Sequence, residues 1–486
     1  MKRITLISIL TLCLLTGFLP PATGQDVVSD DVEEISPNRT VQRTSPNPGI
    51  RANEECPHED MRCEVNERID FLEGTVQGLN KGYKDGSTWT TLKYENNTDT
   101  KYGYKALHQI AMSPSYALKA ITWPFALGAN ELIEHGIVRD VIDVVSNDER
   151  TFWVYPKLEL GFGSGFGGGI GVRHYDLFHR KFLLEVSYEI HIDLNQTQYT
   201  SFGKDDIAHI ADHPVAFRVI SHFKHRNRDN YYGIGIGQPE SAKSQFGYDE
   251  YRAGGWVGYE FIEHLMLKLH SYFVWNDSRS GSGTPLAINT FPASQLAGYG
   301  QDIYYANFGL ELVHDTRDCV AAPEHGGKRS IRFWRYQGVN TTNFDYNEYR
   351  LDVSQFFRVW RPRNVFVLRT MWKYQQQTGA AIPFYRLATL DVYSPLRGFG
   401  WGRFRDRGMA VFNVEYRFPV WDYLDGQFFF DTGRVFHKPT DFSFKNFKYS
   451  GGVGVRLRTR DYFLMRLQFA YGGEGAHFLL KTSQAF

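Results

Sequence analysis

The chain has 486 residues, with 54 basic and 54 acidic side chains and a pI near 7.3. This balance excludes the broad basic field typical of nucleic-acid binding, so no nucleic acid is expected as a partner. Aromatic residues make up 16% of the chain and mean hydropathy is −0.39. Beyond the N-terminus no apolar run approaches the ~18 residues of a membrane helix. The composition excludes a helical membrane protein but is compatible with a transmembrane β-barrel, in which polar lumen-facing residues dilute the lipid-facing ones.

The first segment has the three parts of a secretory signal. Two basic residues precede an apolar stretch over 4–19, and two prolines and a small-residue cleavage site follow it. This order predicts export and cleavage before Gln25. An uncleaved membrane anchor is the weaker alternative, because the apolar stretch is short and ends in prolines. We therefore assign 1–24 to a signal peptide.

Two segments of weak pattern follow the signal. Residues 25–55 are rich in Asp, Glu, Ser, Pro and Asn and contain few large apolar side chains, which predicts a disordered linker. In the next region, 56–150, apolar residues recur at helical spacing between Tyr116 and Val145, with a proline and a glycine as interruptions. We expect a partly helical region there, on the periplasmic side of the membrane.

Three cysteines remain once the signal is removed. Cys56 and Cys63 lie in one short polar stretch and can form a disulfide in an oxidising compartment. A metal site made of Cys56, His58 and Cys63 is the weaker alternative, because a second pair of ligands is lacking. No metal and no other cofactor is expected. Cys319 is left over and is interpreted as an inert thiol.

From 151 onward the hydrophobic period is two, as in β-strands. Between Phe182 and Leu194 apolar side chains alternate with Glu, Ser, His and Asp. Residues 463–471 repeat the alternation, with Arg466 and Gln468 on the polar face. Such one-sided runs are typical of transmembrane barrel strands, because a wet lumen accepts charged side chains that a soluble core would leave unpaired.

The number of strands and the lengths of their connections agree with an outer-membrane barrel. Long connections, near 225–248, 277–302 and 377–408, all follow odd-numbered strand-like segments, and short ones follow even-numbered segments. The turn near 316–328 is longer than expected on the short side. The pattern predicts an all-β, 16-stranded antiparallel barrel over 151–486, with short periplasmic turns and long outer loops. The segments begin near 153, 166, 181, 196, 214, 249, 265, 303, 329, 344, 364, 409, 425, 449, 462 and 476.

One glycine-rich run resembles a cofactor motif. Residues 163–168 match the G-x-G-x-x-G pattern of dinucleotide-binding sites. That site requires a strand before the run and a helix after it, whereas strand-like residues flank this run on both sides. We interpret it as a hairpin turn and a glycine-rich strand. No H-E-x-x-H, G-x-S-x-G or C-x-x-C motif occurs, so the chain is not expected to be an enzyme.

The region 385–436 places charged residues where they can meet in the lumen. Arg397 lies in the long loop after the eleventh strand-like segment. Alternation along the next two segments points Glu415 and Asp431 inward on neighbouring strands. Two carboxylates so placed repel each other unless a cation joins them. An arginine folded back from the loop would suffice, because its planar fork can bridge both.

Several short motifs follow one another in a fixed order along the barrel region. They are Y-Y-G-I-G at 231–235, D-T-R-D at 315–318, R-G-F at 397–399, E-Y-R-F-P at 415–419 and F-x-D-x-G at 429–433. In this order, and with five strands after the R-G-F loop, they resemble the BamA/TamA outer-membrane assembly and translocation superfamily, also called bacterial surface antigens. The resemblance covers 150–486.

The resemblance implies a loop that plugs the barrel. In the family pattern Arg397 docks on Glu415 and Asp431, and Gly433 belongs to the same strand motif. Gly398 is expected to allow a tight turn of the loop backbone, and Phe399 is expected to pack against the barrel wall.

The resemblance also implies a role and a place. We expect a bacterial outer-membrane barrel that assists insertion or translocation of proteins or lipids. Its expected partners are outer-membrane lipid, nascent outer-membrane proteins and an accessory periplasmic protein. One departure is that 25–150 shows no βααββ pattern of the POTRA repeats that precede such barrels. The alternatives are a structural or channel barrel that keeps the plug loop but handles no client and, ranked last, an outer-membrane enzyme or a carrier for a separate passenger.

Overall fold

The computed structural model describes residues 115, 118–119, 145–147, 149, 151–161, 165–320, 322–359, 362–391, 396–421, 424–458 and 463–481. The proposed signal peptide, the linker at 25–55, the Cys56–Cys63 pair and most of the region up to 150 lie outside these residues and stay predictions. Among the residues described, no helix is both long and apolar enough to cross a membrane.

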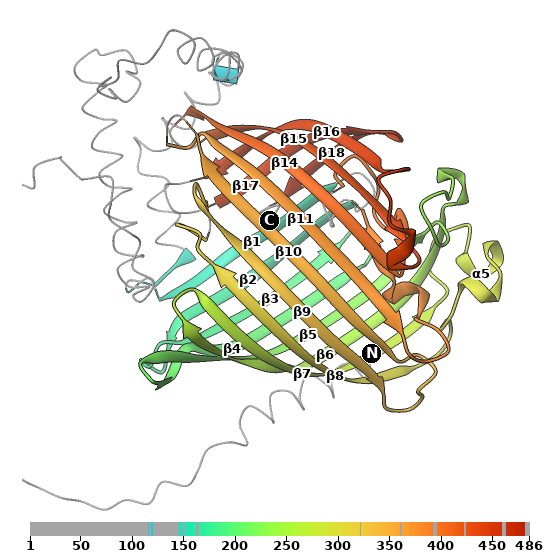
Figure 1. Cartoon of the computed structure of the whole chain (residues 1–486), viewed down its shortest axis with the longest axis horizontal. Helices are drawn as coiled ribbons and strands as arrows, with labels where there is room; N and C mark the ends of the chain where they lie inside the picture. Colours follow the sequence, from blue (N-terminus) through green and yellow to red (C-terminus); the bar gives the residue numbers. More distant parts are fainter. Residues whose placement is uncertain are drawn as a thin grey trace, which may run out of the picture. The chain divides into compact units, whose positions relative to one another are not determined.

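Within the described part of the chain, sixteen antiparallel strands form a closed barrel (Figure 1). The strand bounds are β1 (Phe152–Gly161), β2 (Gly165–Leu177), β3 (Phe182–His191), β4 (Gln196–Ile210), β5 (His213–Tyr231), β6 (Ser244–Ile262), β7 (Leu265–Arg279), β8 (Ile303–Asp315), β9 (Gly326–Gly338), β10 (Tyr346–Arg358), β11 (Val365–Gln377), β14 (Gly408–Trp421), β15 (Leu424–Phe436), β16 (Lys448–Arg458), β17 (Phe463–Gly472) and β18 (Gly475–Lys481). The predicted fold class is confirmed.

Each strand pairs with its neighbours in chain order, with one interruption. Strand β11 pairs directly with β14, because β12 (Ala388–Leu390) and β13 (Phe404–Asp406) form a separate two-stranded sheet in the connection between them. The barrel closes where β1 meets β18, and in the part of this junction that the structure describes Glu159 lies opposite Lys481 and Gly161 opposite Leu479. Strand β2 begins at Gly165 and pairs with both β1 and β3, which excludes the dinucleotide alternative for the glycine-rich run.

The two faces of the wall follow the predicted alternation. On β15, Phe428 and Phe430 are 39% and 47% exposed on the outer surface, whereas Phe429 and Asp431 between them are 5% and 0% exposed on the lumen side. Residues two apart share a face of a strand, so one face of each strand meets lipid and the other meets the lumen.

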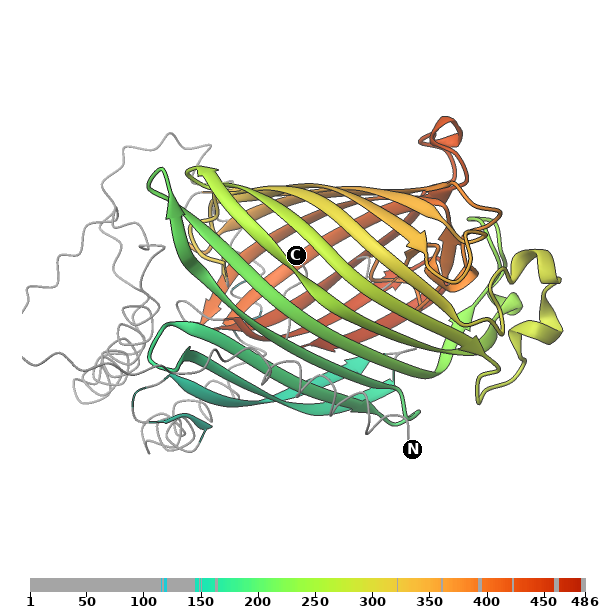
Figure 2. The ribbon, with the colours of Figure 1, turned by 90° about the horizontal axis from the view of Figure 1, so that it is seen from below.

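The connections differ in length at the two ends of the barrel. Only 263–264 separate β6 from β7, whereas 280–302 separate β7 from β8 and 378–407 separate β11 from β14. The β7–β8 connection contains the short helix α5 (Ala287–Thr290), which Figures 1 and 2 show at one end of the barrel. By the rule for outer-membrane barrels, the long loops lie outside the cell and the short turns in the periplasm.

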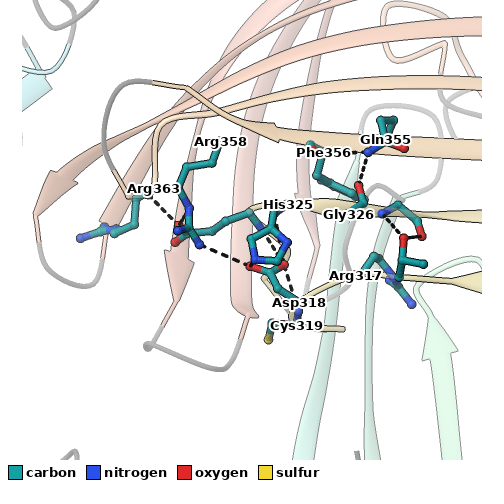
Figure 3. Close-up of polar contacts among 12 residues, drawn as sticks. Arg317, Asp318, Cys319, His325, Gly326, Gln355, Phe356, Arg358 and Arg363 are labelled. Atoms are coloured by element: carbon teal, nitrogen blue, oxygen red, sulfur yellow. Dashed lines mark hydrogen bonds and ion pairs between the residues drawn. The ribbon is translucent and has the colours of Figure 1, made fainter. Parts of the chain in front are cut away.

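The long periplasmic turn between β8 and β9 is held by one carboxylate (Figure 3). Oδ1 of Asp318 accepts the backbone N–H groups of Cys319 at 3.0 Å, Glu324 at 3.0 Å and His325 at 3.2 Å. Arg358, the last residue of β10, pairs with Glu324 at 3.2 Å and with Asp318 at 3.7 Å. The turn is therefore fixed to the neighbouring hairpin.

The same network continues to the next periplasmic turn. The backbone N–H of Arg363 donates to Glu324 at 3.0 Å, and the Arg363 guanidinium pairs with Asp425 at 2.6 Å. It also donates to the carbonyl of Trp421 at 2.5 Å. Arg363 lies between β10 and β11, and Asp425 is the second residue of β15. Three successive periplasmic connections are therefore joined by charged groups.

Three of the described residues ahead of the barrel contact the periplasmic end of β14 and β15. Ser115 Oγ donates to the carbonyl of Pro419 at 2.5 Å. A methyl of Leu118 lies 2.9 Å from where a Cβ on Gly426 would be. The ammonium of Lys119 lies 5.6 Å from the centre of the Trp421 ring. These contacts agree with a periplasmic position for this segment, which stays a prediction for the rest of 56–150.

Candidate functional site

The connection between β11 and β14 folds inward as a compact loop, called here the plug loop (378–407). It contains a short 3-10 helix at Phe384–Arg386 and the β12–β13 hairpin, in which Ala388 lies opposite Asp406. Four of its large apolar side chains are almost fully buried: Leu390 and Leu396 at 0%, Phe399 at 2% and Phe404 at 0% exposure. The loop thus has a small core of its own.

That core is shared with the lumen side of the wall. Phe399 meets Phe404 edge to face, with ring centres 5.3 Å apart. Both belong to one buried cluster with loop residues and wall residues of β11, β14 and β15. Its members are Met371, Ala388, Leu390, Leu396, Phe399, Phe404, Met409, Val411 and Val435. Phe399 therefore packs against the loop's own hairpin as well as against the barrel.

Gly433 gives the hairpin room to approach the wall. A Cβ at Gly433 would lie 3.0 Å from a methyl of Leu390 and 2.8 Å from the carbonyl oxygen of Ala410. Both distances are shorter than ordinary packing contacts, so any larger side chain at 433 would push β12 away from β15.

The structure brings Arg397, Glu415 and Asp431 together in the lumen. Arg397 Nε and Nη2 donate to the two oxygens of Asp431 at 2.8 Å and 2.7 Å, and Nη1 donates to Glu415 at 2.9 Å. The backbone N–H of Arg397 also donates to Asp431, at 3.1 Å. Its guanidinium lies 3.5 Å from the centre of the Phe429 ring. Nε, Nη1 and Nη2 of the planar guanidinium therefore each donate to a carboxylate oxygen of the barrel wall.

The two carboxylates have further partners on the wall. Asn413, opposite Asp431 in the β14–β15 register, donates to it at 2.8 Å. Arg417 Nε donates to Glu415 at 2.7 Å. Glu415 and Asp431 are 1% and 0% exposed, so the charges lie in a site with little contact with water. Removal of one partner from such a site leaves an uncompensated buried charge.

Gly398 lies where the loop backbone touches β16 and β17. A Cβ there would be 2.5 Å from Cβ of Ser450 and 2.8 Å from the backbone nitrogen of Gly472. Gly398 is not among the residues with positive φ, whereas Gly402 in the same loop has φ of +72°. The backbone N–H of Phe399 donates to the carbonyl of Leu396 at 3.1 Å, so Gly398 lies within a tight turn of the loop. The role expected for Gly398 in that turn stays a prediction, and the close approach of two backbones is a second reason for a glycine there.

A second arginine anchors the start of the plug loop. Arg386 forms an ion pair with Glu250 of β6, and its Nε donates to the Tyr346 hydroxyl of β10 at 3.1 Å. Its carbonyl accepts a hydrogen bond from the Gln375 side chain of β11 at 2.8 Å. Its guanidinium also lies 4.9 Å from the centre of the Tyr336 ring. The loop is thus attached to the wall far from Asp431.

Two more arginines anchor the end of the loop. Arg403 pairs with Glu474, in the turn between β17 and β18, at 2.6 Å and donates to the carbonyl of Gln238 at 2.6 Å. Arg405 donates to the carbonyl of Asn230 at 3.2 Å and lies 3.6 Å from Asp229. Sequence reasoning gave no role to Arg386, Arg403 or Arg405. The available signal was the presence of five arginines and only two acidic residues in one loop.

The segment at 231–235 completes the attachment. The backbone N–H of Gly235 donates to the carbonyl of Arg405 at 2.7 Å. Asn230, just before the segment, donates to the carbonyl of Trp401 at 3.3 Å. Gly233 and Gly235 have φ of +93° and +102°, a conformation that side chains disfavour. The backbone after β5 therefore adopts a conformation in which it runs alongside the plug loop and is hydrogen-bonded to it.

Of the remaining candidates, Cys319 lies away from this site, and Cys56 and Cys63 lie outside the described residues. Cys319 lies in the β8–β9 turn and is half-buried. Within the residues described, no group of three His, Cys, Asp or Glu side chains is arranged as metal ligands.

The family follows from the match of the sequence to a family model. Residues 186–486 match the Omp85 superfamily domain. The chain belongs to the Omp85 superfamily. This confirms the resemblance to BamA/TamA barrels and the outer-membrane localisation. No curated protein matches the chain at a significant level.

One solved BamA barrel resembles this one in fold, and a solved CdiB is a weaker match. BamA from Haemophilus ducreyi lacking POTRA domains 1–3 has 14% identity and a TM-score of 0.51, over 68% of this chain and 69% of that chain. CdiB from Acinetobacter baumannii has 12% identity and a TM-score of 0.45, over 69% of this Omp85 chain and 60% of that chain. This chain thus spans less than two thirds of that CdiB.

Proposed function

We propose that this Omp85 barrel assists the insertion or translocation of proteins or lipids at the outer membrane, by opening its wall between β1 and β18. The observation that supports this proposal is that β1 and β18, the first and last strands, pair with each other without a chain connection between them. Every other pair of neighbouring strands in the barrel is joined by a turn or a loop. Only noncovalent contacts hold β1 against β18, so these two strands can separate without a change in any connecting segment.

The plug loop supports a lateral route over a route through the lumen. Its polar contacts reach β6 through Glu250, β15 through Asp431 and the β17–β18 turn through Glu474. Passage of a client through the lumen would require these buried ion pairs to break together. Separation of β1 from β18 leaves all three in place. The loop then acts as a fixed brace inside a barrel that opens at its side.

Glycines on β2 suit a wall that changes shape beside the junction. A Cβ at Gly171 would overlap the Tyr155 ring of β1, with atoms 2.2 Å apart, and a Cβ at Gly169 would lie 2.0 Å from the carbonyl of Tyr188. Glycine in a strand interior weakens the strand and allows close approach of its neighbours. Omp85 barrels are generally transporters and insertases, and the proposal assigns no chemical reaction to the chain.

The test is a disulfide that closes the junction. In a chain with Cys56, Cys63 and Cys319 replaced by serine, Leu160→Cys and Leu480→Cys pair directly opposite each other across β1 and β18. Val154→Cys and Val172→Cys make the matched control across β1 and β2. A photoreactive residue in β1 reports client contact in cells.

We expect crosslinks from β1 to newly made outer-membrane proteins. These crosslinks should be lost when the disulfide across the junction is formed by oxidation and should return when it is reduced. In the control chain, with the disulfide across β1 and β2, the crosslinks should form under both oxidising and reducing conditions. A chain that forms no such crosslinks but conducts solutes in a bilayer would be the structural or channel barrel instead, and the proposal would fail.

A further inference from the structure

The loop between β15 and β16, residues 437–447, folds onto the outer surface of the barrel. Ala410 of β14 and Arg434 of β15 lie on outward-facing positions of their strands, yet they are only 0% and 8% exposed. Phe430, on the same face of β15, is 47% exposed. Figure 2 shows the orange-red loop of this region standing out from the end of the barrel wall. The loop covers the wall at its extracellular end.

Arg434 holds the loop against the wall. Its Nη1 donates to the carbonyl of Ser443 at 2.8 Å, to the Ser443 hydroxyl at 2.8 Å and to the carbonyl of Lys445 at 2.9 Å. An arginine on a lipid-facing position is costly unless its donors are satisfied. Here loop atoms accept from Nη1, and Nε donates to the carbonyl of Val435 at 3.4 Å. The loop position and the arginine therefore depend on each other.

Aromatic rings join the loop to the wall in a continuous cluster. The Phe442 ring centre lies 4.3 Å from Trp372 of β11 and 5.9 Å from Phe436 of β15. Phe447 lies 6.1 Å from Phe442 and 6.1 Å from Phe412 of β14. The small outward residues of β14 make room for these rings, since a Cβ at Gly408 would lie 2.2 Å from the Phe436 ring.

The cluster does not end at the wall. Phe444 lies 5.4 Å from Phe442 and 5.9 Å from Phe447, and it is 77% exposed. Lys438 and Lys445 on the same loop are also exposed. Asp441, the acidic residue of the loop, accepts the backbone N–H of Lys438 at 3.0 Å. One large exposed ring and two exposed lysines therefore occur on the same loop, on a surface continuous with the lipid-facing wall.

We propose that loop 437–447 anchors the barrel in the outer leaflet by binding lipid that carries phosphate groups. Phe442 and Phe444 lie at the boundary between acyl chains and headgroups, and Lys438 and Lys445 contact the phosphates. Aromatic rings favour this boundary because one part of it is apolar and the other wet. Basic side chains near it are attracted to anionic headgroups. The inference uses the outer-membrane position of the barrel and is independent of its proposed transport role.

The first test measures the depth of the loop in a bilayer. A nitroxide is attached at Phe444→Cys in the cysteine-free chain, and the barrel is placed in vesicles of phosphatidylcholine, with or without phosphatidylglycerol. Phe430→Cys gives the membrane-buried reference, and Ser282→Cys in the β7–β8 loop gives the water-exposed reference. Collisions with oxygen and with a water-soluble nickel chelate report the depth.

We expect the label at 444 to collide with oxygen as often as the label at 430 does, and to be shielded from the nickel chelate. The shielding from nickel should be stronger in vesicles that contain phosphatidylglycerol. Nickel accessibility equal to that at 282 in both vesicles would overturn it and would leave an aqueous loop or a protein-binding one. Thr440→Cys, at an exposed position of the same loop, keeps both lysines and gives a second depth measurement in case the first variant does not fold.

The second test addresses the phosphate. Titration of the barrel in neutral detergent with phosphatidylglycerol should raise its unfolding temperature by several degrees, and Lys438→Gln with Lys445→Gln should remove most of that rise. Inorganic phosphate should produce no rise, because the rings need an acyl chain beside the headgroup. Lys243→Gln, in the β5–β6 loop, is the control. An equal rise in all variants would overturn the assignment of the two lysines.

Discussion

At the scale of single residues, the attachment of the plug loop depends on one side chain more than on the others. Arg397 makes two bonds to Asp431 and one to Glu415 through its guanidinium, at 2.7–2.9 Å, in a site where all three side chains are almost completely buried. A lysine would carry the same positive charge, but its compact ammonium group lacks the planar set of donors that a guanidinium presents. The geometry of the fork, and not the charge alone, matches the two carboxylates.

We expect Arg397→Ala to destabilise the folded barrel by about 3–5 kcal/mol, the typical cost of removing one partner of a buried ion pair. Arg397→Lys should recover only part of this, because it cannot satisfy both acceptors. Thermal unfolding in detergent measures the loss. A thiol probe on Thr389→Cys, in the cysteine-free chain, reports whether the hairpin has left the wall.

A double-mutant cycle with Asp431→Asn decides whether the two residues act together. Coupling of about 0.5–3 kcal/mol is expected for groups in direct contact. Strictly additive effects, with the thiol at 389 equally reactive in every variant, would mean that the arginine does not hold the loop.

Gly398 and Gly400 provide a matched pair in the same loop. A Cβ at 398 would lie 2.5 Å from Ser450, whereas a Cβ at 400 would meet only the Tyr232 hydroxyl, at 3.8 Å. We expect Gly398→Ala to cost about 1–3 kcal/mol through overpacking and Gly400→Ala to be close to neutral in the same unfolding measurement. Equal effects of the two substitutions would show that the loop does not press against β16 and β17 there.

At the scale of elements, the plug loop behaves as a small hairpin held at both ends. Arg386 fixes its start to β6 and β10, and Arg403 fixes its end to the turn between β17 and β18. The apolar faces of β12 and β13 fill the space between these anchors. Because the Arg403 anchor reaches the last hairpin of the barrel, the loop stabilises one side of the β1–β18 junction.

Loss of the Arg403 anchor should loosen that last hairpin. A hydrogen bond to a charged group is worth about 1.5–3 kcal/mol, so Arg403→Ala should raise amide exchange at 472–475 by about tenfold or more. Arg180→Ala, at an exposed turn between β2 and β3, is the control and should leave that exchange unchanged. Protection at 472–475 that stays the same in both variants would remove the proposed link between the plug loop and the junction.

At the scale of the whole molecule, one end of the barrel is fixed by charge networks among turns and the other carries the long loops. Asp318, Arg358 and Arg363 tie the periplasmic connections together. Ser115, Leu118 and Lys119 also contact this end, at β14 and β15. The lengths of the loops orient the barrel, and this orientation predicts that the region before the barrel lies on the periplasmic side of the outer membrane.

We expect protease added to intact cells to leave the 116–145 region uncut and to cut it once the outer membrane is permeabilised. A protease site inserted at Ser282, in the β7–β8 loop, is the control and should be cut in intact cells. Immunoblots with tags on either side of each site give the result. Cleavage within 116–145 from outside would reverse the orientation.

The sequence by itself determined the architecture. Alternation with a period of two and the order of short and long connections depend only on local pattern, and they predicted the strand starts to within a few residues, as at β15, expected at 425 and found at Leu424. The same alternation placed Glu415 and Asp431 on the lumen side, where the structure has them. Strands that meet lipid outside and water inside must show this pattern at every step.

Only the tertiary structure decided what the loops do. Arg386, Arg403 and Arg405 pair with residues of distant strands, so no local pattern shows their partners, and Gly398 is needed because Gly472, far along the chain, comes within contact of it. Likewise Arg434 has the strand position of a lipid-facing residue, and its role became visible once loop 437–447 was found folded over it. Contacts between elements depend on how the chain closes in space, which periodicity along one strand does not contain.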